Sequence, residues 1–313
     1  MATLPDPRKV AGSLINRPIG VGGRYRPFYY LNALQRLRGP RSLEDRVRGR
    51  TVLVTGASSG IGEASALRLG SAGASVLLVA RPSERLEQVE AEIRDHGGDA
   101  HAHPCDLAEE DDVERLAAEV LAAHGPVKVL VNNAGISIRR SAEESYDRMH
   151  DYRRTMELNY FGAVRLTLSL LPAMREQRSG HVVNVSTAGV QTRTPRFSGY
   201  VASKAALDAF ADCVAAEVAT DRVRFTTIHM PLVRTPMIEP TKGLYRSVPS
   251  ISAEQAADWV AQAILYRPRQ IGTPFGNAAA FWHAVSPTSL DAVRSAGYQL
   301  QPDTKQPTKG VTE

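Results

Sequence analysis

Residues 51–62 read TVLVTGASSGIG. The apolar run TVLVT is typical of a short buried parallel strand, and a helical pattern over residues 61–73 follows a glycine-rich turn. Glycines at this point allow a tight turn and let the backbone approach a pyrophosphate at the amino end of a helix. The stretch therefore predicts part of a dinucleotide site, formed by Gly56, Ser58, Ser59, Gly60, Ile61 and Gly62.

The spacing of these glycines also occurs in ordinary loops, so the neighbouring segments must decide whether this loop binds a dinucleotide. A second apolar strand, ASVLLVAR, ends at Arg81, where a dinucleotide fold places the residue that reads the adenosine ribose. An Asp or Glu there would accept hydrogen bonds from the 2′-hydroxyl, whereas Arg81 can pair with a 2′-phosphate. We therefore expect NADP(H) rather than NAD(H) as the cofactor, the alternative being that Arg81 is an ordinary surface cation.

Short apolar strands alternate with helical segments from about residue 51 to residue 269 without a linker. This alternation predicts an α/β fold, a Rossmann-type doubly wound parallel sheet in a single domain. We expect a basic N-terminal extension at 1–49, an NADP-binding catalytic domain at 50–270 and a C-terminal extension at 271–313 whose last part is disordered. The two cysteines and the spacing of the histidines indicate neither a disulfide framework nor a metal site.

Charge is unevenly distributed along the 313 residues. Residues 1–50 contain 11 Lys and Arg against 3 Asp and Glu, a net charge of +8 in a chain whose total is +5. Arginines alternate there with aromatic residues, so a basic element that contacts an anionic membrane surface is one interpretation. A packing or solvated extension is the simpler one and is preferred, and no nucleic-acid-binding module accompanies the charge. No apolar run is long enough to span a membrane, and the cytoplasm is the expected location.

Several later segments predict ligand-facing residues at the carboxyl ends of strands, where open parallel sheets bind ligands. Asp106 and Leu107 follow the third strand, and Asp106 is placed to bond an adenine amine. The fourth strand ends in Asn132, Asn133, Ala134 and Gly135, and the fifth ends at Ser186. Asn159 lies in a long helix between them, where an asparagine taken alone is usually structural.

Tyr200 and Lys204 are four residues apart in GYVASKAALDAF and so lie on one face of a predicted helix. An ammonium beside a phenol lowers its pKa and prepares it for proton transfer. This pair favours an enzyme of carbonyl or alcohol chemistry.

TGASSGIG, CDL, NNAG, Asn159, Ser186 and YVASK occur in this order, and together they resemble the short-chain dehydrogenase/reductase family over roughly residues 50–269. The resemblance implies that Tyr200 is the general acid, Lys204 tunes it and holds the nicotinamide ribose, Ser186 orients the substrate oxygen and Asn159 positions a water. It also places Pro231, Val233 and Thr235 at the nicotinamide. Leu232 stands where the family commonly has glycine, which makes that contact less secure.

Three stretches, residues 136–166, 196–210 and 230–242, look like the bacterial fatty acyl-CoA reductases. This resemblance implies NADPH-dependent reduction of a long-chain acyl-CoA to the fatty aldehyde with release of CoA, without a covalent role for Cys105 or Cys213. Two sets of residues are expected around the substrate. An apolar lid over the acyl chain would contain Met237, Ile238, Leu244, Tyr245, Val248 and Ile251. The CoA phosphates would be bound by Arg139, Arg140, Arg193, Arg196, Arg234, Lys242 and Arg246.

Two other functions stay open from the sequence. The same site could act on a ketone or secondary alcohol of a lipid, steroid or 3-oxoacyl compound, or the chain could be a non-catalytic nucleotide-binding scaffold, which leaves the intact catalytic set unexplained. A small lipid molecule is the expected partner in the first two cases. The family resemblance further implies a homodimer or homotetramer.

Overall fold

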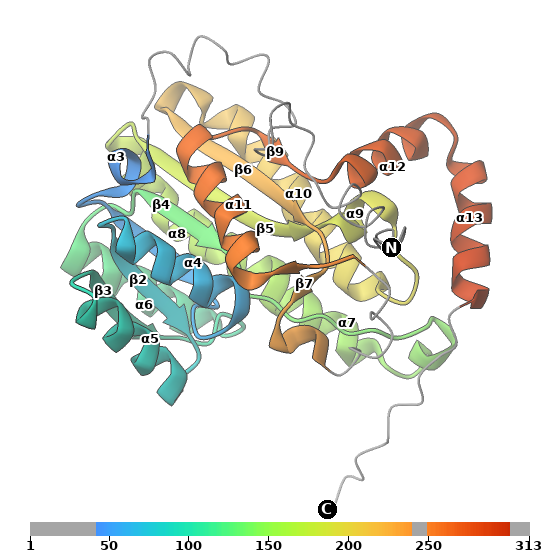
Figure 1. The fold of residues 1–313 in the computed structure, drawn as a ribbon, viewed down its shortest axis with the longest axis horizontal. Coiled ribbons are helices and arrows are strands. Elements are labelled where there is room, and N and C mark those ends of the chain that lie inside the picture. Colours follow the sequence, from blue (N-terminus) through green and yellow to red (C-terminus); the bar gives the residue numbers. More distant parts are fainter. Residues whose placement is uncertain (1–41, 240–248, 301–313) are drawn as a thin grey trace, which may run out of the picture.

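The computed structural model describes residues 42–239 and 249–300, and within them a parallel sheet of seven strands forms the centre of the molecule (Figure 1). The strands are, in spatial order, β3 (Asp99–Pro104), β2 (Ser75–Ala80), β1 (Thr51–Thr55), β4 (Val129–Asn132), β5 (Gly180–Thr187), β6 (Val223–Met230) and β9 (Gln270–Ile271). The chain order reverses between β1 and β4, which is the switch point where such sheets bind ligands. The predicted fold class is confirmed.

Helices cover both faces of the sheet because its strands are apolar on both sides. One face packs against α3 (Leu43–Val47), α4 (Gly60–Ser71), α5 (Glu84–Asp95) and α11 (Ala253–Tyr266). The other packs against α6 (Glu110–His124), α8 (Ala163–Glu176) and α10 (Ser198–Glu217). Val54 and Val131 belong to the first core, and the alternating residues Leu53 and Leu130 belong to the second.

The edge strand β9 was not among the strands predicted from the sequence. It is two residues long and pairs with β6 through Thr227↔Gln270 and Ile228↔Ile271. A strand this short carries no alternation of apolar and polar residues for sequence reasoning to detect. A second small sheet joins β7 (Val233–Arg234) to β8 (Ile251–Ser252), and Ser252 caps α11 in a capping box with Gln255.

Residues 42–49, grouped with the N-terminal extension in the sequence interpretation, pack on the domain. Ser42 caps α3, Val47 is fully buried in the first core, and Arg46 donates to the carbonyl of Leu265. Residues 42–49 therefore belong with the domain, whereas residues 1–41 of the expected extension lie outside the described part of the chain, as do residues 301–313. None of the described helices is both long and apolar enough to cross a membrane.

The remaining helical segments connect or follow the elements above. They are η2 (Glu143–Ser145), α7 (Met149–Met156), η3 (Glu157–Gly162), α9 (Ala188–Thr192), η4 (Ala219–Asp221), α12 (Pro274–Val285) and α13 (Pro287–Leu300). Helices α12 and α13, drawn in red in Figure 1, lie beside α9 and away from the sheet. Gln191 donates to Asn277 over 2.8 Å, and Arg294 donates to the carbonyl of Thr192 over 2.9 Å. The C-terminal segment thus holds the loop that follows β5.

The second core predicts a large cost for removing a buried side chain. Leu130 is fully buried on β4, so Leu130→Ala should lower the free energy of unfolding by about 3 kcal/mol through lost burial and an unfilled cavity. Val293→Ala, at a position that is 66% exposed on α13, should change it by less than about 0.5 kcal/mol. Urea unfolding followed by circular dichroism measures both, and equal effects of the two variants would contradict this packing.

Candidate active site

A cavity of about 780 Å³ opens at the carboxyl ends of the strands, next to the switch point. It is lined by the glycine loop after β1, the NNAG segment after β4, the end of β5, helix α10 and the segment after β6. The predicted residues that line it are Gly56, Ser59, Gly60, Ile61, Asn133, Ala134, Gly135, Ser186, Tyr200, Lys204, Pro231, Val233 and Thr235. One concave surface therefore brings together most of the cofactor and catalytic sets.

The glycine loop is packed so closely that side chains are excluded from it. A Cβ atom at Gly62 would lie 2.0 Å from the carbonyl oxygen of Gly56, and Gly60 has φ +56° with a Cβ position 2.9 Å from the Thr235 side chain. Helix α4 begins at Gly60, and Ser59 makes no side-chain capping bond to it. The first N–H groups of a helix have no partner within it, so this amino end can bind an anion.

Thr55 connects the glycine loop to the end of β4. Its hydroxyl oxygen accepts from the backbone N–H groups of Asn133 at 2.9 Å and Ala134 at 3.0 Å. The Asn133 amide donates back to the carbonyl of Thr55 over 2.9 Å. Sequence reasoning identified Asn133 and Ala134 but missed Thr55, since a threonine at a strand end is unremarkable until its partners are known.

Asn159 is fully buried in η3, a π-helical turn of the kind often found at functional sites. Its oxygen accepts from the N–H of Ile136 at 2.8 Å, and its nitrogen donates to the Ile136 carbonyl and to Ser203 Oγ, both at 2.9 Å. The side chain thus ties the segment after β4 to α10. Its role in positioning a water stays a prediction.

Tyr200 and Lys204 lie one turn apart on α10, as predicted, and both line the cavity. Desolvation raises the pKa of Tyr200 to about 12, against a lowering effect of its hydrogen bond with Thr187, so the phenol carries its proton at neutral pH. Desolvation lowers the pKa of Lys204 to about 8, while the negative charge of Asp208 raises it. Lys204 donates to the carbonyl of Val185 over 2.9 Å. At neutral pH the pair is thus a protonated phenol beside an ammonium.

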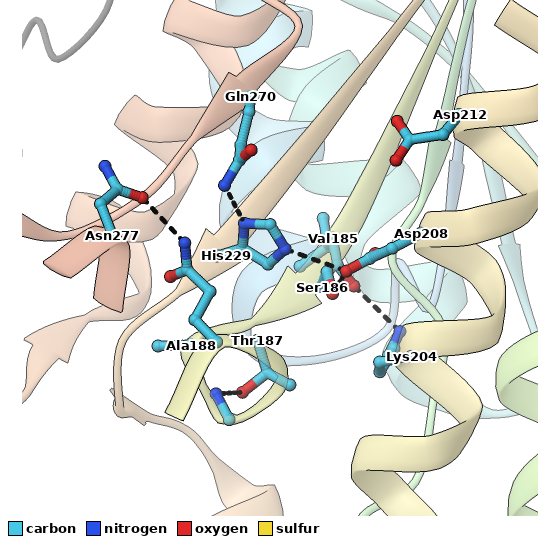
Figure 2. Close-up of polar contacts among 12 residues, drawn as sticks. Val185, Ser186, Thr187, Ala188, Lys204, Asp208, Asp212, His229, Gln270 and Asn277 are labelled. Carbon is cyan, nitrogen blue, oxygen red and sulfur yellow. Dashed lines mark hydrogen bonds and ion pairs between the residues drawn. The ribbon is translucent and has the colours of Figure 1, made fainter. Parts of the chain in front are cut away.

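Ser186 is almost completely buried at the end of β5, and its hydroxyl donates to Asp208 Oδ2 over 3.1 Å (Figure 2). The same oxygen is 2.9 Å from Nε2 of His229 on β6. Neither Asp208 nor His229 was predicted as a site residue. The available signal was the position of Asp208 four residues after Lys204, which places it on the Tyr200 face of the helix.

Six predicted residues do not line the cavity, namely Ser58, Gly62, Arg81, Asp106, Leu107 and Asn159. Arg81 is exposed at the carboxyl end of β2, and Leu107 is buried in the second core. Asp106 accepts from the N–H of Ala108 at 3.0 Å and so shapes the turn after β3. Their contacts with a cofactor stay predictions.

The segment after β6 is partly described. Leu232, Met237 and Ile238 line the cavity, whereas Ile251 packs in the first core through β8. The other expected lid residues, Leu244, Tyr245 and Val248, lie outside the described residues. Phe275 of α12 and Phe197 add apolar surface to the cavity lining.

The arginines expected around the substrate separate into groups. Arg139, Arg140 and also Arg154 line the cavity, although Arg140 pairs with Asp151. Arg196 lies over the ring of Tyr298 at 4.0 Å from its centre, and Arg234 donates to Ser250. Arg193 is exposed in a left-handed backbone conformation after α9. Lys242 and Arg246 lie outside the described residues.

The close packing of the glycine loop generates a test. Gly62→Ala places a methyl group against the Gly56 carbonyl, so it should lower the free energy of unfolding by about 1–3 kcal/mol. Ser59→Ala, at an exposed position without a capping bond, should leave it within about 0.5 kcal/mol of the wild type. Denaturant unfolding of the two variants makes the comparison, and a fully stable Gly62→Ala protein would show that the loop is looser than described.

The family model described as short chain dehydrogenase matches residues 50–243. An uncharacterized oxidoreductase of Mycobacterium tuberculosis (strain ATCC 25618 / H37Rv) is 51% identical over 94% of this chain and 86% of its own length. A fatty acyl-CoA reductase of Acinetobacter baylyi is 50% identical over 82% of this chain and 87% of its own. The crystal structure of a metagenomic short-chain oxidoreductase in complex with NADP superimposes with a TM-score of 0.62, at 33% identity over 70% of this chain and 92% of that one. The chain belongs to the short-chain dehydrogenase family.

Proposed function

We propose that this oxidoreductase reduces long-chain acyl-CoA to the fatty aldehyde with NADPH and releases CoA. The observation that carries the proposal is the single cavity in which the glycine loop, Tyr200, Lys204 and Ser186 meet a wall of apolar side chains. The fatty acyl-CoA reductase from Acinetobacter baylyi, similar to this chain over most of both lengths, supports the choice of substrate.

The described residues fit a dinucleotide at the switch point. The glycines leave room for a backbone approach, and the amino end of α4 offers N–H groups to a pyrophosphate. Arg81, exposed at the end of β2, is placed to pair with a 2′-phosphate, and the similar metagenomic oxidoreductase was solved with NADP. Ser58, Gly62, Asp106 and Leu107 complete the proposed cofactor set. NADPH, when bound, supplies the hydride.

The protein groups handle the proton and the developing oxyanion. Tyr200 keeps its proton at neutral pH and donates it toward the substrate oxygen. Lys204, buried and positively charged one turn away, stabilises negative charge there, and Asn159 would position a water that returns protons from solvent. With a thioester this would give a hemithioacetal, whose C–S bond breaks as its O–H becomes the aldehyde C=O, and the O–H proton goes to the departing thiolate to give free CoA.

A covalent cysteine intermediate is not needed for this reaction. Cys105 is buried, and desolvation raises the pKa of its thiol to about 11, so it is not a thiolate at neutral pH. Cys213 lies on α10 more than three turns beyond Tyr200 and does not line the cavity. Direct reduction of the thioester in the cavity is therefore proposed.

The first test follows NADPH oxidation at 340 nm with palmitoyl-CoA while free thiol is measured in parallel. We expect one thiol per NADPH, no turnover with NADH at equal concentration, and a loss of about 10³-fold in Tyr200→Phe because proton donation is removed. NADPH binding without thiol release would reject the acyl-CoA substrate. It would point instead to reduction of a ketone, or oxidation of a secondary alcohol, in the same cavity.

A second test addresses the CoA phosphates. Arg139 and Arg154 line the cavity and can hold phosphates through charge-assisted hydrogen bonds. The double variant Arg139→Gln/Arg154→Gln should raise the KM for palmitoyl-CoA about 10-fold or more and leave the KM for a free long-chain aldehyde within about 2-fold. Arg153→Gln, at an exposed neighbouring position that does not line the cavity, is the matched control. Equal effects on both substrates would remove this role.

Assembly and location form part of the proposal. We propose a homodimer or homotetramer, and the exposed apolar side chains of Phe161 on η3, 41% exposed, and Leu168 on α8, 49% exposed, support this proposal. We propose a cytoplasmic enzyme, with peripheral membrane contact through the basic residues 1–41 as the finer alternative.

A further inference from the structure

A chain of polar side chains runs behind Ser186 and across separate elements of the fold. Asp208 Oδ2 accepts from Ser186 Oγ at 3.1 Å and lies 2.9 Å from His229 Nε2. His229 Nδ1 lies 2.9 Å from the amide nitrogen of Gln270. Figure 2 shows the four side chains converging from β5, α10, β6 and β9.

The order of donors fixes the charge of this chain. An amide nitrogen can only donate, so His229 Nδ1 accepts from Gln270 and carries no proton. The imidazole proton is therefore on Nε2, which donates to Asp208. In this arrangement His229 is a neutral donor and does not cancel the negative charge of the carboxylate.

The carboxylate is held more tightly than a surface aspartate. Ser186 is 2% exposed and His229 is 7% exposed, and both donors bond the same oxygen of Asp208. The other oxygen, Oδ1, is buried and has no hydrogen-bond partner among the described residues. An asparagine could keep both bonds through its oxygen and lose the charge, and its NH2 group would then occupy the buried position of Oδ1.

The charged groups around Asp208 are few within the described part of the chain. Lys204 precedes it by one turn of α10 and Tyr200 by two, so all three occupy one face. Asp212 follows by one turn but is exposed and paired with Arg269. His229 on β6 is neutral, and β5 contributes the uncharged Ser186. Lys204 is thus the cation with which Asp208 shares the catalytic face.

We propose that Asp208, held in place by His229 and Gln270, is a positioning residue that directs the Ser186 hydroxyl and keeps Lys204 in its ammonium form. The inference rests on the proposed function, in which Ser186 and Lys204 act on the substrate oxygen. Ser186 can donate to that oxygen only by releasing Asp208, so the carboxylate sets how readily the hydroxyl turns. Its charge also offsets the cost of burying an ammonium.

The pH dependence has a defined sign. Lys204 is charged below its pKa of about 8. Desolvation lowers this pKa more than the charge of Asp208 raises it. Removing that charge lowers the pKa further, so an ammonium-dependent activity falls at a lower pH. Tyr200 acts in the same direction, because the charge of Asp208 also raises the phenol pKa. Loss of the charge must therefore move the alkaline limb of the pH–activity profile, where activity falls with rising pH, toward neutral pH.

The experiment compares Asp208→Asn with the wild type and with Asp212→Asn, a matched change one turn along the same helix. For each protein, kcat with palmitoyl-CoA and the Kd of NADPH, from its fluorescence, are measured from pH 5.5 to 9.5. We expect kcat of Asp208→Asn to be about 10-fold below wild type at pH 8.5 and within about 3-fold at pH 6. Its Kd for NADPH should rise over the same alkaline range, whereas the kcat and the Kd of Asp212→Asn should follow those of the wild type. Coincident alkaline limbs in Asp208→Asn and wild type overturn the inference.

Asp208→Ala provides a second variant that also removes the charge. It places no amide N–H at the buried position of Oδ1, which has no hydrogen-bond partner among the described residues. The same alkaline shift is expected, and its absence in a folded Asp208→Ala protein counts against the inference even where Asp208→Asn does not fold. Tyr200→Phe separates the two proposals. Activity retained in Tyr200→Phe rejects the proposed function, whereas an inactive Tyr200→Phe beside an unshifted Asp208→Asn rejects only the role of Asp208.

Discussion

The hydroxyl of Thr55 is the contact on which the arrangement of the site depends. It accepts from the backbone of Asn133 and Ala134 and so joins the glycine loop after β1 to the segment after β4. These two strands flank the switch point, where consecutive connections leave in opposite directions and a crevice must remain. The cavity is lined on both sides of this junction, by Gly56 and by Asn133 and Ala134. The helix amino end of α4 lies on one side, and Asn159 holds the other side through Ile136.

The site places ionisable groups where water is scarce, and their proton affinities follow from that. Burial raises the pKa of Tyr200 and lowers that of Lys204, so both effects favour the uncharged forms. The carboxylate of Asp208 works against this for the lysine and with it for the tyrosine. A protonated phenol beside an ammonium is the combination that a proton donor to a carbonyl oxygen requires. The protonation states on the catalytic face thus depend on Tyr200, Lys204 and Asp208, all on helix α10.

The C-terminal segment shows how a part without recognisable motifs can still shape a site. Gln191 and Thr192 bind it through Asn277 and Arg294, and Phe275 contributes to the cavity wall. The sequence of this segment alone did not indicate where it packs. The described structure places it against α9 because hydrogen-bonding partners more than 80 residues distant meet there, which periodicity cannot reveal.

The sequence by itself determined the doubly wound sheet, the glycine loop and the pairing of Tyr200 with Lys204, because these depend on local patterns: apolar strands, small residues at turns and a helical repeat of 3.6. It also indicated which strand ends face the ligand. Only the tertiary structure decided that Ser186 bonds Asp208, 22 residues away, and that His229 supports the same oxygen from another strand. Such contacts arise where separate elements converge, and a buried polar group takes whichever partner the packing brings within hydrogen-bond distance.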